Sequence, residues 1–335
     1  MLETLRKKAL TVAKDTISQG TRTCLELFKV MVPVIILVKL LQEFELIEAV
    51  ARPLGPVMQL VGLPAEMGLV WASAMLNNIY TAMIVFLPLN AANPLSTAQA
   101  TVLGVMVLVA HGLPIELSIA RKAGPRFLFQ AVTRLGGALL FGVILHQTYA
   151  GLDVLQTPAI VLLAPPSLPD PSLVTWALGE IKNLFFIFLI VTTLMGMMRL
   201  LDAIGAITLL NRLMNPLLRL IGIGPRASAI TVVGLTLGLS YGSGLILHGA
   251  RSGNIDRQDI FYSITLMGLT HSIIEDTLLM LSLGGHLSGL LWGRLGFTLL
   301  IVALLVQVAR KLPPALADNI LWGPPPSNPA PVEPT

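Results

Sequence analysis

The sequence predicts an all-α polytopic membrane protein with about eight transmembrane helices, further re-entrant or interfacial segments, and two internal repeats. Its composition is the first observation, because 54% of the 335 residues are hydrophobic and 12% are charged. Soluble domains average about 25% charged residues. The second observation is the recurrence of apolar segments of the ~20 residues that a crossing helix needs. The third is that the two halves of the chain share uncommon residues.

The apolar segments are the expected transmembrane helices. Most of them contain Gly, Ser, Thr or Asn, and small or weakly polar residues allow helices to pack closely in lipid. We therefore expect these helices to pack against one another. The segments lie near residues 28–49, 67–89, 98–119, 127–149, 175–197, 227–249, 260–283 and 287–309.

Both ends of the chain differ from this apolar pattern. Residues 1–22 are expected to form a basic amphipathic helix, because Leu5, Val12 and Ile17 share one helical face and most of the basic residues lie elsewhere. Such a helix suits an anionic membrane surface, and a solvated helix fits nearly as well. Residues 313–335 are Pro-rich and are predicted to be disordered.

The halves match when one is shifted by about 160 residues along the other. His, Arg and Pro are sparse here, so their coincidence is informative. The sequence therefore predicts repeat 1 over 23–163, a polar linker over 164–172 and repeat 2 over 173–312. The matching pairs are Arg52 and Arg212, Pro56 and Pro216, Tyr80 and Tyr241, His111 and His271, Glu116 and Glu275, Gly124 and Gly284, Arg134 and Arg294, and Gly136 and Gly296.

The topology stays open at this stage. Loops 89–98 and 148–174 have no Lys or Arg, and the positive-inside rule places them outside. Segments 121–126 and 198–226 are basic, which places them inside. Simple crossings of all the segments cannot also place the basic N-terminus inside, so some segments must be re-entrant or interfacial. The repeats can be parallel or inverted.

Two polar interruptions, NNIYTA at 77–82 and LSYGSG at 239–244, lie in the middle of apolar segments. Transporter repeats commonly place the substrate site at their interface, on interrupted helices near the middle of the membrane. We expect these interruptions to bond a solute, although bonding between helices, about 0.6 kcal/mol in measured cases, is the alternative. The residues concerned are Asn77, Asn78, Tyr80, Thr81, Ser240, Tyr241 and Ser243.

A second polar element occurs in each half. His271 and Glu275 are four residues apart and are expected to share a helix face, with His111 and Glu116 at the related place in repeat 1. Two imidazoles and two carboxylates suit a divalent metal ion such as Zn²⁺, Fe²⁺ or Mn²⁺. They equally suit a proton relay. Structural hydrogen bonding between helices is the third interpretation.

Four further residues belong to this element. Arg134 and Arg294 lie inside their helices, and we expect each to pair with the carboxylate of its repeat, Glu116 or Glu275. Asp276 is expected to face the protein or a water-filled cavity. Thr277 can bond back to a carbonyl group of the preceding turn.

Several functional classes find no support. The net charge of +4 comes with basic residues at the ends of apolar segments, so no nucleic-acid partner is expected. The single cysteine excludes a disulfide framework or a cysteine-based metal cluster within the chain. We find no Ser/His/Asp set, HExxH or GxSxG motif, and we expect neither an enzyme nor a cofactor.

The stretches YGSGLILHGARSG at 241–253 and HSIIEDTLLMLSLGG at 271–285 resemble the nucleoside-recognition Gate domain family, and HGLPIELSIARKAG at 111–124 matches more weakly. That family includes spore maturation proteins A and B. It is related to the gate segments of ferrous-iron transporter B and of concentrative nucleoside transporters. The resemblance covers about residues 25–310. The chain lacks a GTPase loop and has no counterpart of the iron-transporter gate cysteines.

The resemblance and the polar centres together predict a multi-pass protein of the bacterial cytoplasmic (inner) membrane. It is expected to act as a transporter or channel for a small polar solute or ion, with a divalent metal as one alternative substrate. The other alternative is a membrane scaffold or assembly protein of the spore-maturation type. Beyond the lipid bilayer, the partners considered are a second copy of the chain and another membrane protein.

Overall fold

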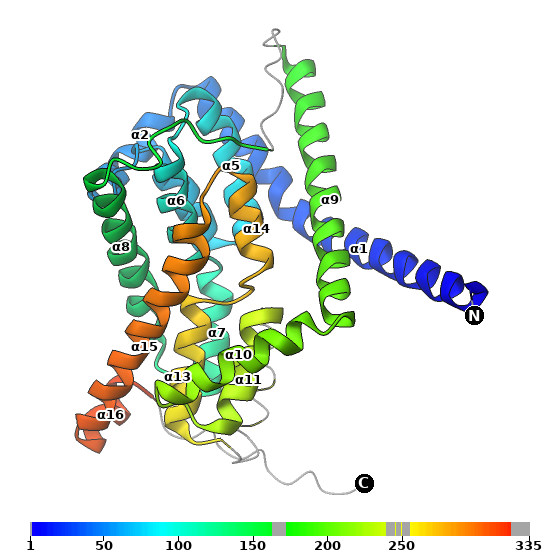
Figure 1. Cartoon of the computed structure of the whole chain (residues 1–335). Coiled ribbons are helices and arrows are strands. Elements are labelled where there is room, and N and C mark those ends of the chain that lie inside the picture. Colours follow the sequence, from blue (N-terminus) through cyan, green and yellow to red (C-terminus); the bar gives the residue numbers. More distant parts are fainter. Residues whose placement is uncertain (1, 163–171, 239–244, 246–248, 250–254, 323–335) are drawn as a thin grey trace, which may run out of the picture.

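The computed structural model describes the whole chain except residues 1, 163–171, 239–244, 246–248, 250–254 and 323–335. The described residues form helices and no strand of a sheet (Figure 1). In chain order these are α1 (Leu2–Glu43), α2 (Ile47–Ala51), η1 (Arg52–Leu54), α3 (Gly55–Leu60), α4 (Met67–Leu76), α5 (Ile79–Ala92), α6 (Thr97–Val109), α7 (Leu113–Ala123), α8 (Phe127–Gly151), α9 (Leu173–Ala203), α10 (Ala206–Leu220), α11 (Pro225–Leu237), α13 (Arg257–Leu269), α14 (Glu275–Ser282), η2 (Ser288–Gly293), α15 (Arg294–Lys311) and α16 (Pro314–Ile320).

The two ends of the helical body are marked by two connecting segments. At one end, which we call the loop end, residues 155–162 bond to the start of α6 through Thr97 N to Thr157 O (2.9 Å) and to the last residue of α14 through Leu162 N to Ser282 O (2.9 Å). At the other end, which we call the α16 end, Leu321 O accepts from the backbone N–H of Arg126, which follows α7. Two broken elements, α6–α7 and α13–α14, run between these ends.

The two broken elements run in opposite directions. The α6–α7 element begins at the loop end and finishes at the α16 end, with a bend of 41° between its helices. The α13–α14 element begins at the α16 end, where Arg257 on α13 pairs with Asp318 on α16, and finishes at the loop end. Figure 1 shows α6 and α14 in the upper half of the body and α7 and α13 in the lower half. The two breaks therefore meet midway.

The helices α4 and α5 form a hairpin whose open side faces the loop end. Gly62, just before α4, accepts a hydrogen bond from the side chain of Gln99 on α6 (3.0 Å). Leu95, just after α5, accepts one from the backbone of Ala159 (2.9 Å). The tip of the hairpin reaches the first break, where Gly112 N donates to Ala74 O (2.9 Å).

The helix α11 occupies a corresponding position from the opposite end. It starts at the α16 end, where Gly224 N donates to the Asp259 carboxylate of α13 (3.0 Å). It ends at the second break, where Ile273 N donates to Leu235 O (2.9 Å). The chain is at the α16 end again at Arg257, where α13 begins.

The polar residues of the first hairpin explain its tip. Asn78 has extended backbone and its side-chain oxygen accepts from the backbone of Thr81 (2.9 Å), which caps α5 at its N-terminus. Asn77 donates to the Thr81 hydroxyl (2.5 Å). An apolar run of this length would otherwise continue as one helix, and the two Asn residues supply the bonds that end one helix and begin the next.

The longer helices pack around the two broken elements. Gly289 lets η2 approach α6 closely, since a Cβ there would lie 2.5 Å from Cγ2 of Thr101. Phe141 of α8 stacks on Phe297 of α15, with ring centroids 4.6 Å apart. In Figure 1, α9 stands beside the body and the N-terminal part of α1 extends away from it.

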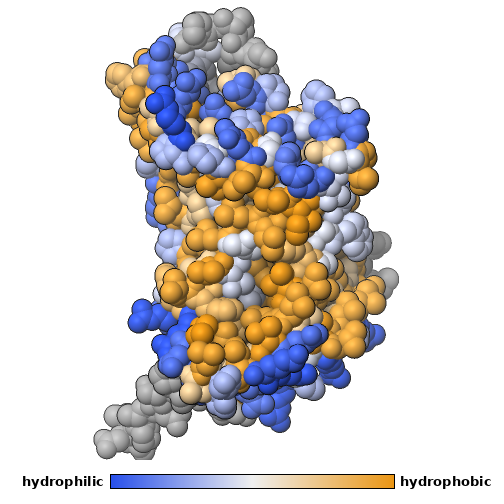
Figure 2. Space-filling view, turned by 90° about the vertical axis from the view of Figure 1, so that its left-hand side faces the viewer, coloured by the Kyte–Doolittle hydropathy of each residue, from blue (hydrophilic) through white to orange (hydrophobic). Residues whose placement is uncertain are grey.

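The surface is consistent with a membrane environment. Figure 2 shows a broad hydrophobic band, with hydrophilic residues gathered above and below it. Among the described residues, three helices are long and apolar enough to cross a membrane: Phe127–Gly151, Leu173–Ala203 and Ser288–Lys311. The bent pair α6–α7 makes a fourth if it crosses as one unit.

Several segments differ from the sequence expectation. The predicted spans 67–89, 98–119 and 260–283 are each two short helices, because polar or left-handed residues interrupt them. The expected boundary at residue 22 falls within α1, a continuous helix that includes the start of the predicted span 28–49 and ends at Glu43. Residues 314–320, expected in a disordered tail, form α16, where Ala317 is buried and Asp318 pairs with Arg257.

Candidate functional site

The two histidines expected from the sequence meet where the broken elements cross. The Nε2 atoms of His111 and His271 are 3.1 Å apart, and both side chains are buried. His111 follows the last helical residue of α6 by two positions, and His271 has the same relation to α13. The breaks thus bring two imidazoles together inside the protein, with ring centroids 4.9 Å apart and ring planes inclined by 51°.

The backbone determines which nitrogen of each ring is protonated. Nδ1 of His111 lies 3.0 Å from Val107 O, and Nδ1 of His271 lies 2.8 Å from Met267 O. A carbonyl oxygen only accepts hydrogen bonds, so each Nδ1 carries a proton. In the neutral rings both Nε2 atoms are therefore acceptors. Two lone pairs at this distance repel each other, and a proton or a metal ion between or beside them would remove that repulsion.

The chain turns sharply just after each histidine. Gly112 has φ of +59° and Ser272 has φ of +44°. Glycine adopts this left-handed conformation freely, whereas a residue with a Cβ is strained in it. The turn separates His111 from α7 and His271 from α14, so the expected shared helix face of His271 and Glu275 is wrong. Residues 270–274 lie between helices, and α14 begins only at Glu275.

Glu116 is the carboxylate nearest the histidine pair. Its Oε1 lies 3.5 Å from Nε2 of His111 and 3.5 Å from Nε2 of His271. Its Oε2 forms an ion pair with Arg134, as the sequence predicts. The remaining donors of Arg134 bond to Val109 O (2.9 Å) and His111 O (2.8 Å). Arg134 thus pairs with the Glu116 carboxylate and also bonds to the carbonyl groups at the break after α6.

The corresponding part of the α13–α14 element is built differently. Glu275 accepts from the Tyr80 hydroxyl (3.0 Å), and Arg294 donates to the Thr277 hydroxyl (3.3 Å) and not to Glu275. Asp276, the next residue, is a second carboxylate near the histidines, and its ligand atom lies within 4.8 Å of theirs. The expected ion pair between Arg294 and Glu275 is therefore not formed.

Two of these buried groups are incompletely bonded within the described part of the chain. Oδ2 of Asp276 and the Nε and Nη1 atoms of Arg294 have no hydrogen-bond partner there. Their side chains are 94% or more buried. An unpartnered buried polar atom typically costs about 1–3 kcal/mol. A ligand or ion that bonded to these atoms would remove that cost.

The expected solute-binding residues fall into two groups. Asn77, Asn78 and Thr81 lie at the hairpin tip and bond mainly to one another, while Tyr80 reaches Glu275 in the centre. The other expected residues, Ser240, Tyr241 and Ser243, lie outside the described residues. Sequence reasoning did not find the carbonyls of Val107 and Met267, which orient the histidines. The signal available for them is the i to i−4 spacing within the preceding helix.

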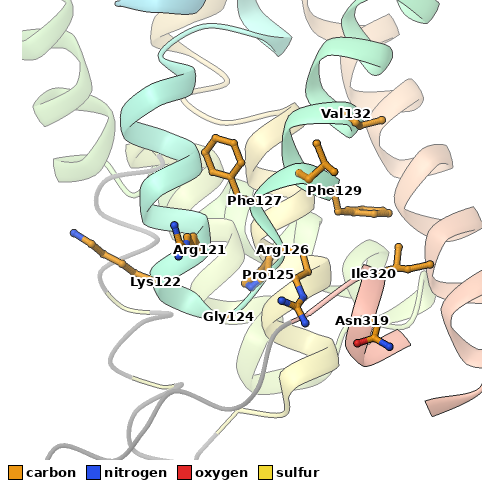
Figure 3. Close-up of a pocket in the computed structure, with 11 residues that line it drawn as sticks. Arg121, Lys122, Gly124, Pro125, Arg126, Phe127, Phe129, Val132, Asn319 and Ile320 are labelled. Atoms are coloured by element: carbon orange, nitrogen blue, oxygen red, sulfur yellow. The ribbon is translucent and has the colours of Figure 1, made fainter. Parts of the chain in front are cut away.

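A separate pocket of about 810 Å³ lies at the α16 end, away from the histidine pair. Figure 3 shows Arg121, Lys122 and Arg126 around it, with Phe127 and Phe129 of α8 and Asn319 of α16 nearby. None of the predicted site residues lines this pocket. Its basic residues mark the charge of this end of the molecule.

Comparison with known proteins agrees with the membrane assignment. The chain is 27% identical over 303 residues to an uncharacterized membrane protein, YvoD, of Bacillus subtilis (strain 168), and the match covers 89% of this chain and 95% of YvoD. No family model matches the chain. No solved structure matches it. This similarity and the apolar helices show a membrane protein, and the resemblance to the Gate family stays a prediction.

Proposed function

We propose that this chain is a multi-pass transporter or channel-like protein of the bacterial cytoplasmic membrane. It moves a small polar solute or ion through the centre where the α6–α7 and α13–α14 breaks meet. The observation that carries the proposal is the convergence there of two histidines and the carboxylates Glu116 and Asp276 from antiparallel broken helices, with Arg134 of α8 paired to Glu116. Ionisable residues inside a membrane cost free energy to bury and usually mark substrate or ion pathways.

The arrangement is that of inverted repeats. In the first repeat the hairpin α4–α5 extends from the loop end to the centre. In the second repeat α11 extends to the centre from the α16 end. Matching hydrogen bonds, Gly112 N to Ala74 O and Ile273 N to Leu235 O, join each to its break. Inverted repeats whose broken helices meet near the bilayer midplane are a common transporter design. This geometry also supports the resemblance to the Gate family.

The charge distribution gives the orientation. The α16 end carries Arg121, Lys122 and Arg126, whereas residues 148–162 at the loop end contain no Lys or Arg. By the positive-inside rule the α16 end faces the cytoplasm. The hairpin α4–α5 is then re-entrant from outside, and α11 enters from inside. This orientation is compatible with all the basic and Lys/Arg-free segments, which simple crossings of every apolar segment are not.

A flux assay tests the proposal. Purified protein is reconstituted into liposomes, and uptake of divalent cations, nucleosides and protons is measured with an entrapped indicator or a radiolabel. We expect flux of one class, lost in His111→Ala and His271→Ala and retained in His286→Ala, whose side chain is exposed at the surface. Absence of flux for every class in the wild type would overturn the proposal in favour of the scaffold alternative.

A further inference from the structure

We propose that the centre binds one divalent transition-metal ion through Nε2 of His111, Nε2 of His271 and Oε1 of Glu116, with Asp276 as a second carboxylate nearby. This inference rests on the proposed function, because it names the substrate class of the same site. It concerns the class of ions that prefer mixed nitrogen and oxygen ligands, such as Zn²⁺, Fe²⁺ and Mn²⁺.

The distances fit a shared ion. The three ligand atoms form a triangle with edges of 3.1, 3.5 and 3.5 Å. Two nitrogens at ~2.05 Å from a tetrahedral zinc ion lie about 3.3 Å apart, and a nitrogen and a carboxylate oxygen lie about 3.4 Å apart. The triangle therefore has the dimensions of one face of a metal tetrahedron, formed by residues from two different elements.

A shared proton explains this arrangement less fully. A proton can join the two Nε2 atoms at 3.1 Å in an ordinary hydrogen bond. It leaves Oε1 of Glu116 at 3.5 Å from both rings, beyond the usual hydrogen-bond range. It also leaves Oδ2 of Asp276 unpartnered. One cation equidistant from the three ligand atoms accounts for the rings and the first carboxylate, and it lies near the second carboxylate, whose ligand atom is within 4.8 Å of those of the histidines.

Hydrogen bonds around the site orient its ligand atoms for metal binding. Ligating histidines usually donate their other ring nitrogen to a carbonyl or carboxylate, which fixes the tautomer that presents a free lone pair. His111 and His271 both do so, through Val107 O and Met267 O. Arg134 holds Oε2 of Glu116, and this ion pair directs Oε1 towards the rings. All three ligand atoms are thus oriented before an ion arrives.

The charge of the centre favours a cation. Glu116, Glu275 and Asp276 are three carboxylates, and Arg134 and Arg294 are two guanidinium groups, so the formal charge is −1 when every carboxylate is ionised and the histidines are neutral. Glu275 and Arg294 both lie close enough to act electrostatically on Asp276. A divalent ion changes this formal charge from −1 to +1. Because the resulting net charge is small, the ion can be bound and also released.

Metal binding to the purified full-length protein tests the inference. The detergent-solubilised protein is freed of metal with a chelator and dialysed against Zn²⁺ or Co²⁺, and bound metal per chain is measured by mass spectrometry. We expect one ion per wild-type chain. In Glu116→Gln and His271→Ala the affinity falls at least about tenfold. His286→Ala, which removes an exposed histidine, retains wild-type binding.

Asp276→Asn separates a ligand role from a structural one. The substitution keeps the shape of the side chain and removes the negative charge, so the metal-free protein is expected to unfold at or above the wild-type temperature. Its metal affinity falls, and the stabilisation by added metal shrinks. Equal metal affinity in the wild type, Glu116→Gln and Asp276→Asn would overturn the inference, as would a wild type that binds no metal.

The flux assay distinguishes this inference from the proposed function. Flux of a nucleoside or proton through a protein that binds no metal would overturn the metal site and leave the transport function. Metal binding at His111 and His271 without flux of any solute would leave the site and overturn transport.

Discussion

At the scale of single residues, Arg134 explains how charge is kept inside an apolar body. It is 2% exposed, and its donors bond to Glu116 and to two carbonyls at the break that ends α6. The last carbonyls of a helix lack partners within the helix, and a cation near them is favourable. One side chain thus completes the end of α6 and neutralises a carboxylate.

Removal of Arg134 alone is expected to destabilise the protein strongly. Arg134→Met leaves Glu116 as an unpaired buried charge, so the free energy of unfolding should fall by about 3–5 kcal/mol. The double variant Arg134→Met with Glu116→Leu removes both charges and should recover part of that loss. Thermal or denaturant unfolding in detergent measures both. Equal losses in the single and double variants would contradict the ion-pair explanation.

The two left-handed positions permit a paired prediction. Gly112→Ala introduces a Cβ at φ +59°, 3.1 Å from Oε1 of Glu116, so it should destabilise the protein by 1 kcal/mol or more. Ser272→Gly removes the strain of φ +44° and should leave stability unchanged or raise it by a few tenths to about 1 kcal/mol. The two changes in the unfolding midpoint therefore have opposite expected directions. A loss of stability in Ser272→Gly would show that its side chain matters more than its backbone.

At the scale of elements, the sequence predicted the existence of the polar interruptions better than their geometry. NNIYTA was expected to interrupt a helix, and it does so between α4 and α5. The helical spacing of His271 and Glu275 was misleading, because a break lies between them, and a period of 3.6 residues has no meaning across a break. Asp276 lies near the histidines, and Glu275 bonds to Tyr80 instead, because of where α14 begins. Sequence alone does not fix that position.

The tip of the first hairpin depends on one cap. Asn78→Ala removes the oxygen that accepts from the backbone of Thr81, and it should lower the free energy of unfolding by about 0.5–2 kcal/mol. Asn78→Ser retains a capping oxygen and serves as the matched control. Indistinguishable unfolding midpoints for the Ala and Ser variants would show that the tip is held by other contacts.

At the scale of the whole molecule, the antiparallel course of the two broken elements predicts that the loop end and the α16 end lie on opposite sides of the membrane. Whether the repeats were parallel or inverted was left open by the sequence. Hydropathy counts each apolar run as a crossing, whereas the hairpin α4–α5 returns to the end it started from. The basic residues at the α16 end then predict that this end is cytoplasmic.

Cysteine labelling in cells measures this topology. Cys24 is the one natural cysteine and is buried, so Cys24→Ser gives a suitable background. With a membrane-impermeant thiol reagent, Asp153→Cys at the loop end should react in intact cells. Lys122→Cys at the α16 end should react only after the membrane is opened. Reaction of both in intact cells would contradict the antiparallel arrangement.

The most direct test of the central claim is whether water and small solutes reach the centre. Glu275→Cys in the Cys24→Ser background places a thiol beside Tyr80 and Asp276, where the two breaks meet. A transport pathway predicts that a small charged thiosulfonate reagent modifies this thiol from at least one side of the membrane, with Asp153→Cys as the fully reactive control. A thiol that stays unmodified from both sides while the control reacts would contradict a pathway through the centre and favour a membrane scaffold.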